Sequence, residues 1–257
     1  MIRMTLQGFI FLILAVLYLL EMIVNAITEF DLFIRERIVM HRIKQRRKMI
    51  NHDEQVSPLS FNRQPYVKSK RVLTGLQGEK IVRHKIYEGE VGYSLHDCLL
   101  PISQNEYVQI DHLVVNEYGI FVIETKNYYG KVTGKEQERY WQQTSNHHQH
   151  DFYNPIMQNR THIEAIKYVL HDQTIPCFNM VVFTGKAKIH VLSDSIFNKK
   201  NFITYINKTR EVQWTDEEQK KIILTIENAI EHDPTKRIEH DMNVANRYSK
   251  RIDRVSV

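Results

Sequence analysis

Apolar residues in the middle of the chain fall into short runs of the kind found in buried strands. Residues 107–115 and 118–125 are rich in β-branched and aromatic side chains, and the turn-forming Asn116 and Gly119 lie at the junction. The pattern predicts a hairpin of two strands. Because residues 120–123 are all apolar, we expect burial on both faces. A similar run predicts another buried strand over residues 177–184.

Helical spacing of apolar residues predicts three helices beside these strands, over residues 72–86, 154–171 and 216–231. Thr215 is a suitable N-cap for the third helix. The first helix contains Gly75 and Gly78, and small residues three apart allow a helix to approach a sheet closely.

The start of the chain has a different pattern, a 19-residue apolar segment from Leu6 to Val24 that is interrupted by Gln7 and Glu21. A segment of this length can span a bilayer. A signal peptide cleaved near residues 24–26 is the alternative. The basic residues that follow favour a retained anchor with the rest of the chain in the cytoplasm, because positively charged loops stay on that side.

The net charge of +5 is concentrated beside this apolar segment. Residues 35–50 contain seven basic residues and one acidic residue, a net charge of +6, whereas residues 51–257 contribute +1. We therefore expect the basic segment 35–48 to contact anionic lipid headgroups. The basicity of the whole chain is no argument for binding to nucleic acid.

These patterns divide the 257 residues into five parts. About 200 residues remain after the anchor and the basic segment, enough for one domain with a substantial core. The expected parts are a transmembrane anchor at 1–28, a basic juxtamembrane helix at 29–50, a linker at 51–70, a folded domain at 71–232 and a polar, exposed tail at 233–257.

Two acids and a lysine in the predicted hairpin could form a site that cuts phosphodiester bonds. If residues 116–119 form the loop, Asp111 lies directly across from Glu124, with Cβ atoms roughly 5 Å apart. A two-residue loop at 116–117 makes the two acids diagonal neighbours on the same face. Glu124 and Lys126 share a face because side chains alternate along a strand. An exposed salt bridge between them is the alternative interpretation.

The chemistry of such a site explains these residue types. Carboxylate oxygens bind Mg²⁺ or Mn²⁺, and the ion activates water and stabilises charge on the transferring phosphate. In this hypothesis Asp111 and Glu124 are metal ligands. Lys126 orients or deprotonates the attacking water and offsets charge in the transition state.

Three ordered motifs resemble the nuclease-related domain, NERD, of the PD-(D/E)xK nuclease superfamily: GLQGE at 75–79, QIDHLVV at 109–115 and YGIFVIETKNYYG at 118–130. The resemblance is clearest over residues 71–190. It implies a restriction-endonuclease-like α/β fold, a mixed sheet flanked by helices, with Asp111, Glu124 and Lys126 as the catalytic group.

The same resemblance adds residues outside the hairpin. It implies that Glu79, in the first predicted helix, lies near the metal ion as a third acidic ligand. Gln158 matches a later glutamine of the family and is included among the candidate catalytic residues, beside the Asn154-Pro155 pair, and Trp141 matches a tryptophan that follows the core strands.

Other candidate sites are weaker. Cys98 and Cys177 lie in apolar segments and are expected to be buried, reduced thiols. His112 is expected to be packed or hydrogen-bonded. The chain has no GxxxxGK(S/T) and no GxSxG motif, which disfavours NTP and serine hydrolysis. A polar cluster could bind a transition metal but lacks the spacing of a closed site; its members are His147, His148, His150 and Asp151.

The sequence thus predicts a single-pass protein of the cell membrane whose cytoplasmic domain is a Mg²⁺- or Mn²⁺-dependent nuclease acting on DNA or RNA. A noncatalytic, membrane-tethered module that binds nucleic acid or protein is the alternative. A third possibility is a membrane-assembly component whose partner is another membrane protein.

Overall fold

The computed structural model describes residues 70–145, 148–208 and 211–255. All of these residues belong to one compact unit. Within the described residues, no helix is long and apolar enough to cross a membrane. The predicted anchor, the basic juxtamembrane helix and the linker up to residue 69 lie outside the described residues.

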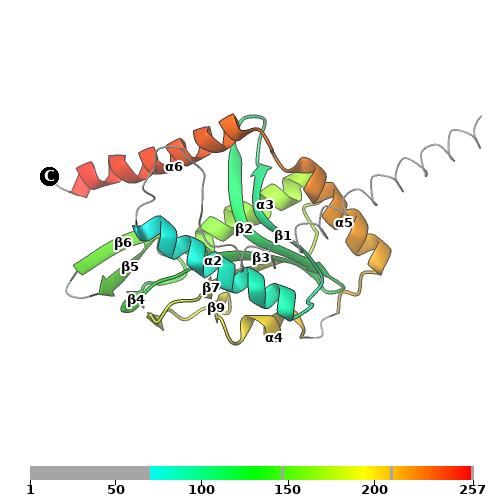
Figure 1. Cartoon of the computed structure of the whole chain (residues 1–257), viewed down its shortest axis with the longest axis horizontal. Helices are drawn as coiled ribbons and strands as arrows, with labels where there is room; N and C mark the ends of the chain where they lie inside the picture. Colours follow the sequence, from blue (N-terminus) through cyan, green and yellow to red (C-terminus); the bar gives the residue numbers. More distant parts are fainter. Residues whose placement is uncertain (1–69, 146–147, 209–210, 256–257) are drawn as a thin grey trace, which may run out of the picture. The chain divides into compact units, whose positions relative to one another are not determined.

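A five-stranded mixed sheet with the strand order β1-β2-β3-β7-β9 forms the centre of this unit (Figure 1). Its first three strands are antiparallel neighbours, and β7 and β9 continue the sheet in parallel with β3. The strands are β1 (Tyr93–Pro101), β2 (Tyr107–Asn116), β3 (Gly119–Lys126), β7 (Cys177–Phe183) and β9 (Ile196–Asn198). Central β3 is buried at every position except Lys126, as its apolar run predicts.

The β2–β3 hairpin has the register expected for a loop over residues 116–119. Asn116 pairs with Gly119 and His112 pairs with Ile123, so the shorter loop considered for residues 116–117 is wrong. Buried Asn116 stabilises the turn, because its Oδ1 accepts the Tyr118 N–H at 3.0 Å. Gly119 has a φ of 141°, a conformation that favours glycine.

Helices cover both faces of this sheet, and each face has its own apolar core. The helices α3 (Pro155–Leu170) and α5 (Asp216–Ala229) pack on the face that includes Val122. The helices α2 (Lys70–Glu88) and α4 (Phe202–Ile206) pack on the face that includes Phe121. The three predicted helices and the strand predicted at 177–184 are therefore confirmed, with shifts of one to two residues at most of their ends.

A second, four-stranded mixed sheet has the order β6-β5-β4-β8. Its strands are β4 (Lys131–Thr133), β5 (Tyr140–Ser145), β6 (His148–Tyr153) and β8 (Lys188–His190). Val132, Trp141 and Phe152 form an apolar cluster with Ile156 of α3 and Phe183 of β7. The sequence predicted one mixed sheet; this second one was missed because its strands are three to six residues long and mostly polar outside that cluster.

The N-cap predicted at Thr215 is confirmed, but the tail expected after residue 232 is helical. Thr215 caps α5, because its Oγ1 accepts the Glu218 N–H at 3.2 Å while the Glu218 carboxylate accepts the Thr215 N–H at 2.8 Å. The expected polar tail is the helix α6 (Pro234–Val255). Its residues 241–244 are exposed, whereas Lys236, Arg237 and His240 are half-buried. Pairs such as Lys236 with Glu239, 3.3 Å apart, support a helix with few apolar contacts.

Candidate active site

Strands β2 and β3 separate at the end of the sheet opposite their turn, and Asp111 lies in the fork between them. The last paired residues of β2 and β3 at this end are His112 and Ile123. One residue further on, the Asp111 Oδ2 accepts the Thr125 N–H at 2.7 Å. The Thr125 N–H thus donates to the side chain of Asp111 and not to a main-chain carbonyl of β2. Past this point β2 continues along β1, and β3 continues along β7.

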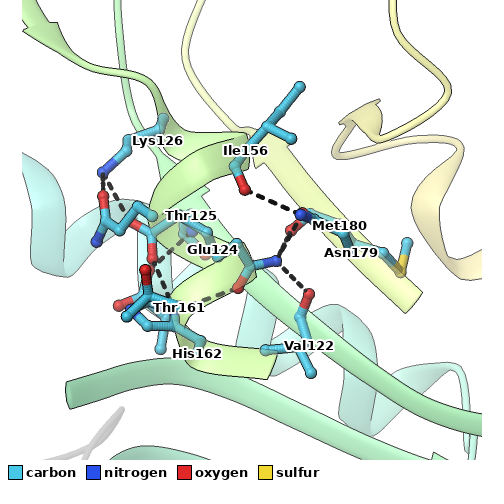
Figure 2. Close-up of polar contacts among 12 residues, drawn as sticks. Val122, Glu124, Thr125, Lys126, Ile156, Thr161, His162, Asn179 and Met180 are labelled. Atoms are coloured by element: carbon cyan, nitrogen blue, oxygen red, sulfur yellow. Dashed lines mark hydrogen bonds and ion pairs between the residues drawn. The ribbon is translucent and has the colours of Figure 1, made fainter. Parts of the chain in front are cut away.

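Glu124 and Lys126 project from β3 toward α3 (Figure 2). The Lys126 Nζ donates to the Glu124 Oε1 at 2.6 Å and to the Gln158 Oε1 at 3.2 Å. The Glu124 side chain is 3% exposed and that of Lys126 is 17% exposed. The two residues do form an ion pair, but it is buried, unlike the exposed salt bridge of the alternative interpretation.

The second carboxylate oxygen of Glu124 is the least satisfied atom of the site. Glu124 Oε2 is buried and has no hydrogen-bond partner among the described residues. Its distance to the His162 Nδ1 is 3.6 Å, which is too long for a hydrogen bond. A buried, unpaired polar atom costs about 1–3 kcal/mol, and more when it is charged. A cation bound to this oxygen would offset that cost.

Glu79 reaches the same end of the sheet from α2. Its neighbour Gly78 packs against the sheet so closely that a Cβ atom there would lie 2.8 Å from the Asn127 Cβ and 2.9 Å from the Thr184 Oγ1. Gly75 has no such neighbour, since nothing lies within 4 Å of a Cβ built on it. One of the two glycines thus makes the close approach that the sequence predicts.

Burial and neighbouring acids raise the pKa of two carboxyl groups of this site, those of Asp111 and Glu79. Burial, followed by the charges of Glu124 and Glu79, holds the pKa of Asp111 well above its ordinary value. Burial, followed by Asp97 and Glu124, raises the pKa of Glu79. Carboxylates that repel each other in a poorly solvated place are stabilised by a bound cation.

Lys126 has the opposite electrostatic situation. Burial lowers its pKa, but the nearby Glu124, helped by Tyr128 and Asp111, outweighs burial, so the pKa of Lys126 is raised. Lys126 is therefore an ammonium group at neutral pH. Such a group can offset negative charge, but it is a poor base.

Two polar residues of α3 were missed by the sequence analysis. Asn159 and His162 are buried beneath the helix, where the His162 Nδ1 lies 3.2 Å from the Asn159 Oδ1. The sequence carries a signal for them, because Asn159, His162, Ile163 and Ile166 share the i, i+3, i+4, i+7 spacing of the apolar face. Polar residues on the apolar side of a helix need buried partners.

The site does not hold a complete set of closely grouped metal ligands. In the part of the chain that the structure describes, no group of three or more His, Cys, Asp or Glu side chains is arranged to hold a metal ion. Asp111, Glu124 and Glu79 nevertheless act on one another electrostatically, and Glu124 Oε2 is unpaired. The chemistry of these donors fits a hard divalent cation.

The other candidates lie outside this group. His112 is buried, and its Nδ1 lies 3.0 Å from the Nδ1 of His96, as expected for a packed histidine. Cys98 is buried; Cys177 is half-buried, and burial raises its pKa to about 12. In the polar cluster, His147 lies outside the described residues, while His148, His150 and Asp151 are exposed along β6.

Comparison with known proteins identifies the region that contains this site. The family model described as the nuclease-related domain matches residues 74–184. An uncharacterized protein of Bacillus anthracis is 31% identical over 185 residues, which cover 68% of this chain and 86% of the relative. No solved structure matches the chain significantly. The matched region runs from α2 to the residue after β7 and includes all five candidate catalytic residues.

Proposed function

The chain belongs to the nuclease-related domain family, and from this membership we propose that it is a metal-dependent nuclease that hydrolyses nucleic-acid phosphodiester bonds. The observation that carries the proposal is the fork between β2 and β3. Asp111, Glu124 and Lys126 lie at this fork, and Glu79 approaches it from α2. A mixed sheet flanked by helices supports the restriction-endonuclease-like fold expected from the resemblance.

Asp111 and Glu124, with Glu79 in support, would hold Mg²⁺ or Mn²⁺. A bound ion would stabilise charge on the phosphate and lower the pKa of a water molecule. The unpaired Glu124 Oε2 and the raised pKa values of Asp111 and Glu79 support this assignment. Burial is the first cause of both raised pKa values and repulsion between acids the second, and a bound cation would stabilise the charged carboxylates against both.

Lys126 offsets the negative charge that develops on the phosphate. Its Nζ is held between Glu124 and Gln158, so the ammonium group is fixed by two hydrogen bonds instead of swinging freely. Two roles were expected for Lys126, orientation or deprotonation of water and charge stabilisation. Its raised pKa favours charge stabilisation. Gln158 is a positioning residue in this scheme.

The amino-terminal residues give the enzyme a location. We propose that residues 6–24 anchor it in the cell membrane by a single span and that the basic segment 35–48 lies on the cytoplasmic side. The length of the apolar segment and the position of the basic residues support this topology. The nuclease unit then faces cytoplasmic nucleic acid.

The test is a cleavage assay on the full chain, purified in mild detergent. Labelled single- and double-stranded DNA and RNA are incubated with Mg²⁺, Mn²⁺ or EDTA. We expect metal-dependent cleavage by the wild type. The cleavage rate should fall at least 100-fold in Glu124→Gln, which removes the charge of a metal ligand, and in Lys126→Ala, which removes the charge that stabilises the phosphate. Glu117→Gln, a matched change in the turn at the far end of the hairpin, should cleave like the wild type.

A noncatalytic, membrane-tethered binding module remains the second candidate function. The observation that favours it is the lack, within the described residues, of a ready group of three metal ligands. Nucleic-acid binding by a folded wild-type chain, with no metal-dependent cleavage and no effect of Glu124→Gln, would select this function. Cleavage that survives Glu124→Gln unchanged would show that the fork is not the active site.

A further inference from the structure

We propose that His162 is a positioning residue for Glu124, and that Asn159 and Asn179 hold His162 in place. The inference rests on the proposed nuclease function, because Glu124 is the proposed cation ligand there. It adds a chain of polar side chains that runs from half-buried Asn179 on β7 through buried Asn159 and His162 of α3 to the carboxylate of β3 (Figure 2).

The chain begins at Asn179 on β7. Its Nδ2 donates to the main-chain oxygen of Ile156 at 2.9 Å, which orients the amide so that its Oδ1 is available to Asn159. The Asn159 Nδ2 donates to this Oδ1 at 2.9 Å and to the main-chain oxygen of Val122 at 2.7 Å. Oxygen atoms surround that nitrogen, so the Asn159 amide has one favourable orientation.

The orientation of Asn159 determines which nitrogen of His162 carries hydrogen. With its Nδ2 engaged by the sheet, Asn159 presents its Oδ1 to the His162 Nδ1 at 3.2 Å. An oxygen acceptor at this position requires a hydrogen on Nδ1. His162 is therefore a fixed Nδ1–H donor.

The same N–H group lies beside the unpaired oxygen of Glu124. The distance from the His162 Nδ1 to the Glu124 Oε2 is 3.6 Å, and both side chains are at most 4% exposed. A shift of a few tenths of an ångström would let the single Nδ1–H be shared between the Asn159 Oδ1 and the Glu124 Oε2 in a three-centre hydrogen bond. On its other side, Glu124 is held by Lys126 at 2.6 Å. His162 thus limits the rotation of the carboxylate from the side of α3.

A purely structural role would not require this chemistry. The positions of Asn159 and His162 lie on the apolar side of α3, where apolar residues would pack without the cost of burying polar groups. Residues that orient a metal ligand typically change metal affinity or activity by about 10–100-fold when they are replaced. Asn159 and His162 are therefore placed as residues that orient Glu124 would be.

The experiment is an isothermal calorimetric titration of the full, metal-free chain in detergent with MnCl₂. Three variants separate the role of the donor from that of the ring. His162→Phe keeps the ring but loses the N–H, His162→Asn places an amide N–H near the former Nδ1, and His162→Gln places one near the former Nε2. We expect the Phe and Gln variants to bind Mn²⁺ about 10–100-fold more weakly than the wild type. The Asn variant should retain most of the affinity.

Circular dichroism of each variant shows whether it is folded, and the Asn and Gln pair still tests the proposal if the Phe variant does not fold. Equal Mn²⁺ affinity in the wild type, Phe and Gln variants would overturn the positioning role and leave the nuclease proposal intact. Equal losses in folded Asn and Gln variants would also overturn it. A wild-type chain that binds no Mn²⁺ would overturn both proposals.

Discussion

Glu124 and Asp111 are placed where a residue selected only for stability would be apolar. Each directly follows a buried isoleucine, Ile110 or Ile123, and burial raises the pKa of Asp111. The sequence reveals this placement, because an acid within an apolar run is costly unless it is paired. Helical spacing indicates that His162 is buried, but the sequence does not show that it lies beside Glu124, because no local pattern encodes the distance between β3 and α3.

The cost of this placement predicts that Asp111→Asn stabilises the metal-free protein at neutral pH. Asparagine can still accept the Thr125 N–H but carries no charge near Glu124 and Glu79. Each 1 kcal/mol gained would raise Tm by about 2–4 °C in a domain of this size. Thermal unfolding in EDTA measures the shift. Asp194→Asn, which changes an exposed aspartate, should leave Tm unchanged.

The stability difference between the wild type and Asp111→Asn should change with pH in one direction. The pKa of Asp111 is higher in the folded state than its ordinary value of 3.8, so the folded chain holds the proton more tightly. Wild-type stability relative to Asp111→Asn should therefore fall as pH rises from about 4 through the folded pKa. Unfolding curves of both proteins across this range test the sign. A difference that grows in favour of the wild type with rising pH would contradict the raised pKa.

At the scale of whole elements, sequence patterns located helices and strands better than they located contacts. Asn116 and Gly119 indicated the hairpin but left two registers open, and the observed register places Asp111 at the fork. The spacing of Gly75 and Gly78 indicated that α2 approaches the sheet. The sequence could not show which glycine does so, because that depends on the side chains of Asn127 and Thr184 from distant segments.

This difference between the two glycines predicts opposite effects of the same substitution. Gly75→Ala should raise the free energy of unfolding by up to about 1 kcal/mol, because alanine favours the helix and has open space. Gly78→Ala should lower it by about 1–3 kcal/mol, because the new Cβ meets the sheet at under 3 Å. Urea unfolding midpoints measure both. A Gly78→Ala protein as stable as Gly75→Ala would show that α2 does not pack closely against the sheet at Gly78.

At the scale of the whole molecule, the main sheet was predictable and the second sheet was not. The three strands predicted in the main sheet, β2, β3 and β7, have seven to ten residues and carry apolar runs, whereas β4 and β8 have three residues each. The two strands pair in parallel and are far apart in the sequence, so no local pattern of apolar residues predicts their pairing. Trp141 was noticed only through the family resemblance. The structure shows that it packs the second sheet against α3 and β7.

The amino-terminal segment yields the last prediction, because two physical mechanisms could hold the chain on a membrane. An apolar span at residues 6–24 would be retained after washing with high salt and alkaline carbonate. Attachment by the basic segment 35–48 alone would be lost in high salt, since salt screens charge between exposed groups. We expect the full chain to stay in the membrane pellet under both washes.

Two variants separate the contributions of these segments in the same fractionation. Deletion of residues 1–28 should move the chain to the soluble fraction at high salt, whereas replacement of the basic residues between 42 and 48 by glutamine should leave it in the pellet. Release of the full chain by salt would show that the attachment is electrostatic. A mature chain that mass spectrometry finds cut near residues 24–26 would instead support the signal peptide and place the nuclease unit outside the cytoplasm.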